Sequence, residues 1–323
     1  MTRRRPGGRP RGHWRARCTH PVALALLLSS APLGLAQSLD WQPVPEPDET
    51  ALADAISVGH EDQFPLYACR APSGGGTQAG RYRPDFDGCH IGFSGQEISV
   101  KPFEVLAAAW QDGRGGSIPP DSLASGQRVM ASADSRFVLA PLYSCRASYL
   151  TGVQAGEVAA GDRGCRFGFG GRQVTVQKYQ VLWDAPWMTW VPGTISQLPQ
   201  DAVVGGSEGG ERFYICRGSD ATGVHPGKIK QSSPGCAFAS DGAEVVTRRF
   251  SVLVPRWVAG NAGTLPVSAL PVGVEKQDPL YLCRSQARDS MQIGKMMERF
   301  AACHIGMMGK EGTSASYEIL SGR

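Results

Sequence analysis

Short stretches of alternating apolar and polar residues, separated by turn-forming residues, run through most of the chain. Residues 212–216 (Arg-Phe-Tyr-Ile-Cys) are typical, since aromatic and β-branched residues lie between clusters of Gly, Pro, Ser and Asp. In residues 143–147, Tyr, Cys and Ala alternate with Ser and Arg, which places Tyr and Cys on one face of a strand and Arg on the other. Helical periodicity is nowhere sustained over ten residues. The pattern predicts an all-β protein made of antiparallel meanders.

The strand pattern recurs as a 38-residue block that occurs four times, at 69–106, 145–182, 216–253 and 283–320. The blocks agree without a gap at a first Cys, at the Arg after it, at a second Cys twenty positions later and at a closing Val-Leu or Ile-Leu. Each block completes a longer unit that opens on a Trp. We call the units repeat 1 (41–106), repeat 2 (110–182), repeat 3 (190–253) and repeat 4 (257–320).

Two irregularities interrupt the repetition. Repeat 2 carries a nine-residue insertion between Gly126 and Cys145, which we expect to lengthen a loop. The longest interval between units, residues 183–190, contains a Pro and three Trp. We therefore predict two paired-repeat modules, 37–186 and 187–323, joined at a packed junction.

Residues 1–36 have the composition of a signal peptide. Seven Arg precede an apolar run at 22–28, and small residues follow, so that cleavage is expected before Gln37. A retained N-terminal anchor is the alternative. The apolar run is too short and too soon interrupted for a membrane span, and no later stretch approaches that length, which predicts a mature chain without a span.

Removal of this segment changes the charge of the protein. Without its seven Arg, 26 basic residues face 29 acidic ones, a net charge of about −3 with His neutral. The basic surface of a nucleic-acid-binding protein is therefore not expected. The remaining eight Cys, two in each repeat, indicate an oxidising compartment, so the protein is predicted to be secreted or periplasmic.

The equal Cys separation predicts one disulfide inside each repeat: Cys69–Cys89, Cys145–Cys165, Cys216–Cys236 and Cys283–Cys303. Each would contribute about 3 kcal/mol in the chain-entropy account of disulfide stabilisation. A zinc site is the competing interpretation. Cys-x-x-Cys pairs, which are typical of zinc ligands, do not occur in the sequence, and we predict no metal and no cofactor.

The composite pattern resembles the DM-nine repeat family. In repeat 3 the resemblance is carried by Cys216-Arg217, Pro226-Gly227-Lys228, Gly235-Cys236, Glu244 and Val252-Leu253. It implies a β-rich protein with paired repeats, and some members of that family are lectins that bind mannose-type glycans. The family's sugar site combines an acidic residue with the Lys of Pro-Gly-Lys.

Two positions carry opposite charges in every repeat: eight residues before the first Cys and twelve after it. Three repeats have an acid first and a base second: Glu61 with Arg81, Glu208 with Lys228, and Glu275 with Lys295. Repeat 2, without its insertion, has the reversed pair Arg128 and Glu157. These positions coincide with the binding pair that the resemblance implies. A carboxylate that accepts and an ammonium that donates can clamp neighbouring sugar hydroxyls; the alternative is a plain salt bridge.

Other repeated residues are given structural interpretations. The Arg after the first Cys (70, 146, 217, 284) is expected to pair with Glu97, Glu244 or Glu311. The Trp at the repeat starts are expected in the core rather than under a sugar. The mature His residues (60, 90, 225, 304) lack metal spacing and are expected to be ordinary strand residues.

No repeated Ser, His and Asp set and no phosphate-binding Gly loop occurs, so an enzyme is not predicted. The favoured function is an exported carbohydrate-binding protein whose several sites act together on a glycan. A scaffold protein that makes protein contacts is the alternative, and a glycan hydrolase is a third option. Glycans are the expected partners, and the sequence leaves oligomer formation open.

Overall fold

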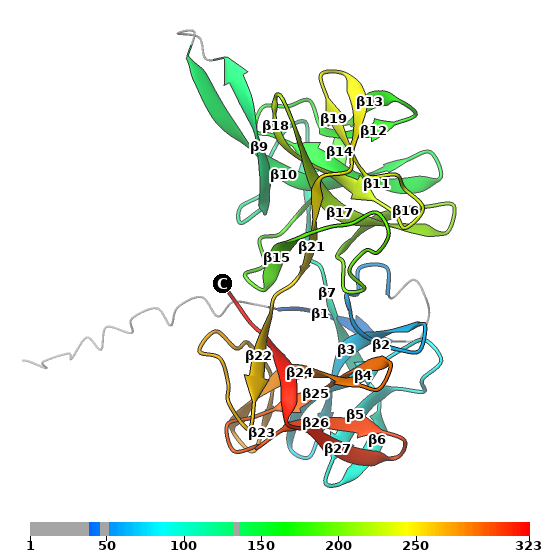
Figure 1. The fold of residues 1–323 in the computed structure, drawn as a ribbon, viewed down its shortest axis with the longest axis vertical. Coiled ribbons are helices and arrows are strands. Elements are labelled where there is room, and N and C mark those ends of the chain that lie inside the picture. The colour runs from blue at the N-terminus through cyan, green and yellow to red at the C-terminus, as the bar shows by residue number, and fades with distance from the viewer. Residues whose placement is uncertain (1–38, 46–51, 132–135) are drawn as a thin grey trace, which may run out of the picture. The chain divides into compact units, whose positions relative to one another are not determined.

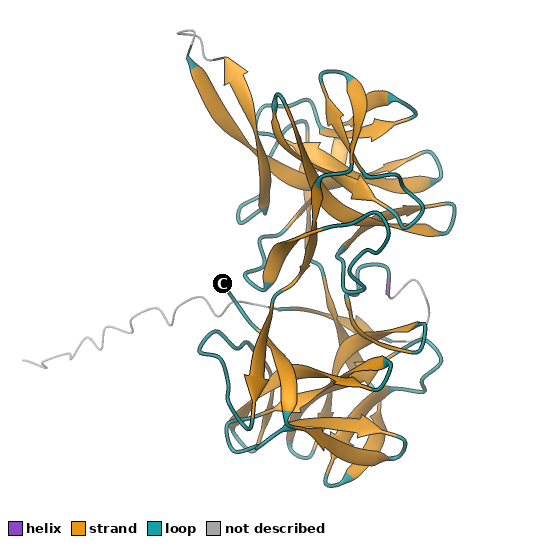
Figure 2. Cartoon of the chain, viewed as in Figure 1, coloured by secondary structure: helices purple, strands orange, loops and turns teal. Residues whose placement is uncertain are grey.

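The computed structural model describes residues 39–45, 52–131 and 136–323. Every named element is a strand, seven to each repeat, which confirms the all-β prediction (Figure 2). Residues 37–323 form one compact unit. The predicted signal peptide lies outside the described residues. Within the described part of the chain, no helix has the length and apolar composition needed to cross a membrane.

The strand order is the same in each repeat. Repeat 1 contains β1 (Asp40–Val44), β2 (Ser57–Glu61), β3 (Phe64–Ser73), β4 (Gly76–Tyr82), β5 (Cys89–Phe93), β6 (Gln96–Val100) and β7 (Phe103–Ala107). Repeat 2 contains β8 (Trp110–Arg114), β9 (Ala124–Ala131), β10 (Phe137–Tyr149), β11 (Gly152–Val158), β12 (Cys165–Phe169), β13 (Arg172–Val176) and β14 (Lys178–Leu182).

The second half of the chain repeats this order. Repeat 3 contains β15 (Met188–Pro192), β16 (Val204–Glu208), β17 (Glu211–Asp220), β18 (Gly223–Ile229), β19 (Cys236–Ser240), β20 (Ala243–Thr247) and β21 (Phe250–Pro255). Repeat 4 contains β22 (Trp257–Asn261), β23 (Pro271–Glu275), β24 (Asp278–Ala287), β25 (Ser290–Met296), β26 (Cys303–Met307), β27 (Lys310–Ser314) and β28 (Ser316–Leu320).

The strands form two antiparallel sheets of fourteen strands each. The 1–4 sheet joins repeat 1 to repeat 4 through the neighbours β2–β25, β6–β27 and β4–β23, and Figure 1 shows strands from the two ends of the chain side by side there. The 2–3 sheet joins repeats 2 and 3 through β11–β16, β13–β20 and β9–β18. The further pairings β3–β4 and β24–β25 close the strand order of the 1–4 sheet on itself.

This pairing differs from the expected modules. The sequence predicted that consecutive repeats pair within 37–186 and within 187–323, and that prediction is wrong, because repeat 1 shares its sheet with repeat 4. Strands β14 and β15 belong to opposite ends of the strand order of the 2–3 sheet. The long interval 183–187 therefore spans a sheet rather than separating two modules, and its Trp187 is fully buried in the central core.

Five hydrophobic clusters form the core. The central cluster takes residues from all four repeats, and the repeat-opening Trp pack against its margin, as expected (Trp41, Trp110, Trp190, Trp257). Each of the other four clusters belongs to one repeat and contains both of its Cys. All four predicted disulfides are present, with Cα atoms 5.8–6.0 Å apart. The zinc alternative is thereby excluded, since every mature Cys is bonded to another Cys.

The insertion in repeat 2 does not form the longer loop that was expected. It extends β9 and β10 into an antiparallel hairpin in which Phe137 lies opposite Ala131 and Leu139 lies opposite Val129. Phe137, Val138 and Leu139 on this hairpin are exposed. The alternation of apolar residues in the insertion was a strand signal that the loop interpretation overlooked.

Candidate functional site

The base of each predicted pair lies where two repeats meet. A Gly precedes Arg81, Lys228 and Lys295 in the sequence. At Gly80 an added Cβ would lie 2.2 Å from the carbonyl oxygen of His90, and the equivalent Gly in repeats 3 and 4 are equally confined. The absence of a side chain lets β4 approach β5 closely. The neighbouring base is then held between its own repeat and the paired one.

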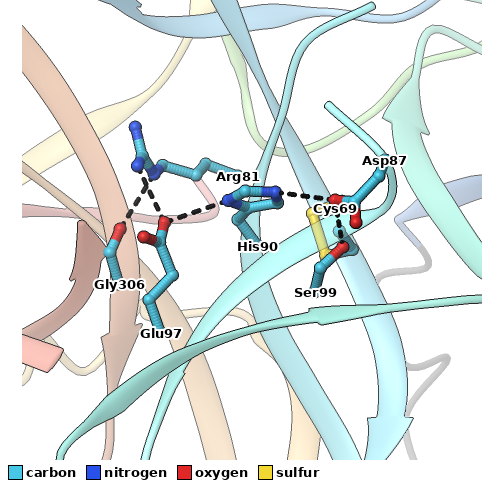
Figure 3. The surroundings of a disulfide bond; sticks show 8 residues. Cys69, Arg81, Asp87, His90, Glu97, Ser99 and Gly306 are labelled. Atoms are coloured by element: carbon cyan, nitrogen blue, oxygen red, sulfur yellow. Dashed lines mark hydrogen bonds and ion pairs between the residues drawn. A yellow bond between two sulfur atoms is a disulfide. The ribbon is translucent and has the colours of Figure 1, made fainter. Parts of the chain in front are cut away.

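Arg81 contacts residues of both repeats in the 1–4 sheet and is only 4% exposed. Its Nη1 donates to Glu61 (3.3 Å) and to Gln292 of repeat 4 (3.0 Å). Its Nη2 donates to Glu97 (2.8 Å) and its Nε to the carbonyl oxygen of Gly306 (2.8 Å). Figure 3 shows the Glu97 and Gly306 contacts beside the Cys69 disulfide. The predicted Glu61–Arg81 contact is therefore present, within a larger network.

Glu97 is the second carboxylate of this network. It also accepts hydrogen bonds from His90 (3.1 Å) and from the backbone N–H of Gly309 in repeat 4 (2.8 Å). Burial by itself would raise the pKa of Glu97, but the Gly309 N–H and the Arg81 guanidinium outweigh it and leave the pKa below its ordinary value. Glu97 thus remains ionised and ties repeat 1 to repeat 4.

Lys295 occupies the equivalent place in repeat 4 and is 2% exposed. Its Nζ donates to Gln78 Oε1 of repeat 1 (2.5 Å) and to Glu275 Oε2 (3.3 Å). The Gln78 amide also donates to Glu275 (3.2 Å), so that the three side chains form a closed triangle. Burial lowers the pKa of Lys295, while Glu275 opposes the shift. The predicted Glu275–Lys295 pair is present, with the carboxylate 14% exposed and nearer to solvent than the ammonium.

Lys228 in repeat 3 differs from the prediction in its partner. Its Nζ donates to Gln154 of repeat 2, whose amide nitrogen donates in turn to Glu208 (3.4 Å). The acid and the base are therefore bridged by an amide from the paired repeat. Burial lowers the pKa of Lys228, and the charges of Glu244 and Glu208 oppose the shift. The ring of Phe213 lies 5.0 Å from the ammonium and closes one side of the site.

The reversed pair in repeat 2 is not formed. Arg128 binds Asp162 (2.7 Å) instead of Glu157. Glu157 is completely buried and contacts Arg166 (2.5 Å) and His225 of repeat 3 (2.8 Å). The prediction was wrong because it did not consider Asp162, an acid that stands where repeats 1 and 4 have a Phe and that offers Arg128 a nearer partner.

The position nine residues after the first Cys was missed by the sequence reasoning. It is Gln78, Gln154, His225 and Gln292 in the four repeats. In every pairing this residue reaches across to the charged residue of the paired repeat. The signal was available, since Gln is replaced by His only where the paired repeat replaces its base by Glu157. His225, expected to be an ordinary strand residue, is thus part of a buried charged cluster.

The repeated Arg after the first Cys lies on a different surface from the bases. Each guanidinium stacks on the Trp that opens its repeat, at 4.2–4.6 Å from the ring centroid. Arg70 pairs with Glu104 (2.6 Å) and Arg284 with Glu318 (2.7 Å). The predicted partners Glu97, Glu244 and Glu311 are wrong, because the strand next to the one carrying the Arg is the closing strand of the repeat, as in β3 and β7.

The described residues contain no group of three or more His, Cys, Asp or Glu side chains placed to hold a metal ion. The site consists instead of buried bases, partly exposed acids and bridging amides at the boundary between paired repeats. Such a chain is a tandem-repeat all-β protein whose repeats complete one another in pairs. The model of the DM9 repeat matches residues 59–132, 139–247 and 208–314, more than half of the chain. The protein therefore belongs to the DM9 repeat family.

Two further comparisons add little. Among solved structures, the chain is similar to the crystal structure of the nematode sperm cell motility protein MFP2B, with 12% sequence identity and a TM-score of 0.19. The similarity covers 88% of this chain and 97% of that chain, but a score this low supports no structural argument. Comparison with curated proteins finds no match.

Proposed function

We propose that this protein is an exported, non-catalytic lectin that binds mannose-type glycans at its inter-repeat sites. Membership of the DM9 repeat family supports carbohydrate binding as the general role. The four intra-repeat disulfides fit an oxidising compartment, secreted or periplasmic, to which the signal peptide at 1–36 would direct the chain. The ligand-binding residues are Glu208, Lys228, Glu275, Lys295, Glu61 and Arg81.

The observation that carries this proposal is the unused donor capacity of the two lysines. An ammonium has three N–H donors. Among the described residues Lys295 donates to two side chains and Lys228 to one, which leaves donors for a ligand hydroxyl. The adjacent carboxylate accepts a hydroxyl hydrogen at the more exposed side of the site. Neighbouring hydroxyls of a hexose need this combination of a fixed donor and a fixed acceptor.

The three sites should not bind equally. Arg81 has five N–H donors and already makes four hydrogen bonds with described residues, so Glu61 and Arg81 have the least capacity left. The sites of Lys228 and Lys295 are therefore the principal ones. Because these two sites belong to different sheets, a branched glycan or a dense glycan surface would gain affinity by engaging both.

The test uses the protein from Gln37 onward on a broad glycan array and in titrations with oligomannose. Glu208→Gln combined with Glu275→Gln keeps side-chain shape and removes both acceptor charges. Loss of two charge-assisted hydrogen bonds of about 1.5–3 kcal/mol each predicts a drop in affinity of at least tenfold per site. Lys310→Gln on exposed β27 is the matched control and should bind like the parent.

The bases themselves are less suitable for this test. Sequence reasoning expected exposed pairs whose removal leaves the melting temperature almost unchanged, but Lys228 and Lys295 are 6% and 2% exposed. Lys→Met variants should therefore lower the melting temperature as well as the affinity. If the folded Glu→Gln double variant binds oligomannose as tightly as the parent, the assigned residues are wrong.

The scaffold function remains the second candidate because of one observation. The charged residue twelve positions after the first Cys contacts the paired repeat in all four repeats, which is what a purely structural tie would do. A parent protein that binds no glycan on the array, with all four disulfides formed, would replace the lectin proposal by this one.

A further inference from the structure

A cavity of about 690 Å³ lies between repeat 2 and repeat 3, away from the Lys228 site. Its walls come from β9 and β10 on one side and from β17 and β21 on the other, and they include Ser125, Gln127, Arg217, Ser219, Arg249 and Ser251. Cavities of about 660 and 410 Å³ occupy the corresponding places beside Arg146 and Arg284. The volume is in the range that is typical of small-ligand sites.

The three cavities differ in their acidic residues. Asp54 and Asp112 line the cavity of Arg146, and Glu318 lines that of Arg284. The cavity of Arg217 has two Arg and no Asp or Glu among its described lining residues. The difference arises from one position on the closing strand, where repeats 1 and 4 have Glu104 and Glu318 and repeat 3 has Ser251.

Arg217 is therefore a guanidinium without a counter-charge. Arg146 pairs with Asp54, and Arg284 pairs with both Glu318 (2.7 Å) and Asp201 (2.8 Å). The contacts of Arg217 within the described chain are the Trp190 ring, 4.5 Å from its Cζ, and the Ser125 carbonyl oxygen at 3.4 Å.

The environment of Arg217 favours an anionic ligand. Burial lowers the pKa of this guanidinium, and no acid opposes the shift. A partly buried cation that stacks on an aromatic ring presents its N–H edge to a bidentate anion.

We propose that this cavity binds a sugar that carries a carboxylate, such as a hexuronate, with the carboxylate on Arg217 and the ring hydroxyls on Ser219, Ser251 and Gln127. Arg249 at the rim adds positive charge that favours the approach of an anion. The serine hydroxyls and the glutamine amide both donate and accept, which suits a ligand with hydroxyls next to its acid group. This site shares no residue with the inter-repeat clusters, so it would operate whether or not those bind mannose.

The experiment titrates the protein from Gln37 onward with digalacturonate and with neutral digalactose, which differs only in lacking the carboxylates. Digalacturonate should bind at least tenfold more tightly, and its affinity should fall as salt is raised. Ser251→Glu supplies the carboxylate that repeats 1 and 4 already carry, and it should abolish this preference without unfolding the protein. Glu318→Ser is the matched control, because Asp201 still neutralises Arg284 and no new uronate site should arise.

Further arms separate the outcomes. Arg217→Lys keeps the charge but loses the bidentate geometry, so a loss of affinity is expected there too. Oligomannose binding should be unchanged in Ser251→Glu, and digalacturonate binding should be unchanged in Glu208→Gln with Glu275→Gln. Equal affinity for digalacturonate and digalactose, or uronate binding that survives Ser251→Glu, would overturn the assignment. Binding of an acidic peptide such as triglutamate as tightly as digalacturonate would refute the sugar.

Discussion

Replacing Glu157 by Ala should destabilise the protein more than most single changes. Its carboxylate is fully buried and is shared by Arg166 and by His225 of the paired repeat, which are themselves mostly buried. Removing one partner of a buried charged pair typically costs about 3–5 kcal/mol, because the remaining charge is left without compensation. At about 2–4 °C per kcal/mol for large domains, the melting temperature should fall by about 6–20 °C.

The assay for this prediction is thermal unfolding followed by circular dichroism and calorimetry, with disulfides intact. Glu157→Gln keeps the shape and one acceptor, so its effect should be smaller than that of Glu157→Ala but still measurable. The exposed residue Glu298 is the matched control, and Glu298→Ala should change stability by no more than about 0.5 kcal/mol. If Glu157→Ala melts within 2 °C of the parent, the cluster does not hold repeats 2 and 3 together.

Fragment 108–256, which contains repeats 2 and 3 whole, should melt cooperatively by itself, whereas fragment 37–186 should not, because its repeats belong to different sheets; circular dichroism melts of both fragments check this. Glu97→Gln should reduce the acid sensitivity of the fold. The folded pKa of Glu97 lies below its ordinary value of 4.5, so its stabilising contribution is full above about pH 4.5 and is lost as the pH falls through the folded pKa. Urea midpoints between about pH 3 and pH 6 would show a parallel loss in parent and variant if this account were incorrect. Replacing Cys216 and Cys236 by Ala should cost about 2–5 kcal/mol, seen as a lower urea midpoint, and an unchanged midpoint would contradict a stabilising role for that disulfide.

Features set within one repeat were predictable from the sequence. The positions of the strands follow from local alternation, and the spacing of Cys69 and Cys89 on facing strands recurs in every repeat, so the disulfides could be assigned without a structure. The burial of Trp41 and its equivalents against the core also follows from residue type. These predictions succeed because each depends on a short range of sequence.

Features set between repeats were not predictable in the same way. Which repeat pairs with which depends on how two sheets close, and no residue in 183–190 encodes that choice locally. The partner of Arg70 required knowledge that β3 lies beside β7 rather than β6. Lys228 was given the correct acid, but the amide of Gln154 that separates them comes from the paired repeat.

The order in which the repeats pair also decides how the chain can fold as it is made. Repeats 2 and 3 are adjacent in sequence and can complete their sheet as soon as both have been synthesised. Repeat 1 emerges first yet needs β23 and β25 of repeat 4, the last to appear, for its neighbours. Its strand edges therefore stay unpaired during most of synthesis and export, when exposed edges favour aggregation. A chaperone that protects the newly exported chain would be needed most by its first repeat.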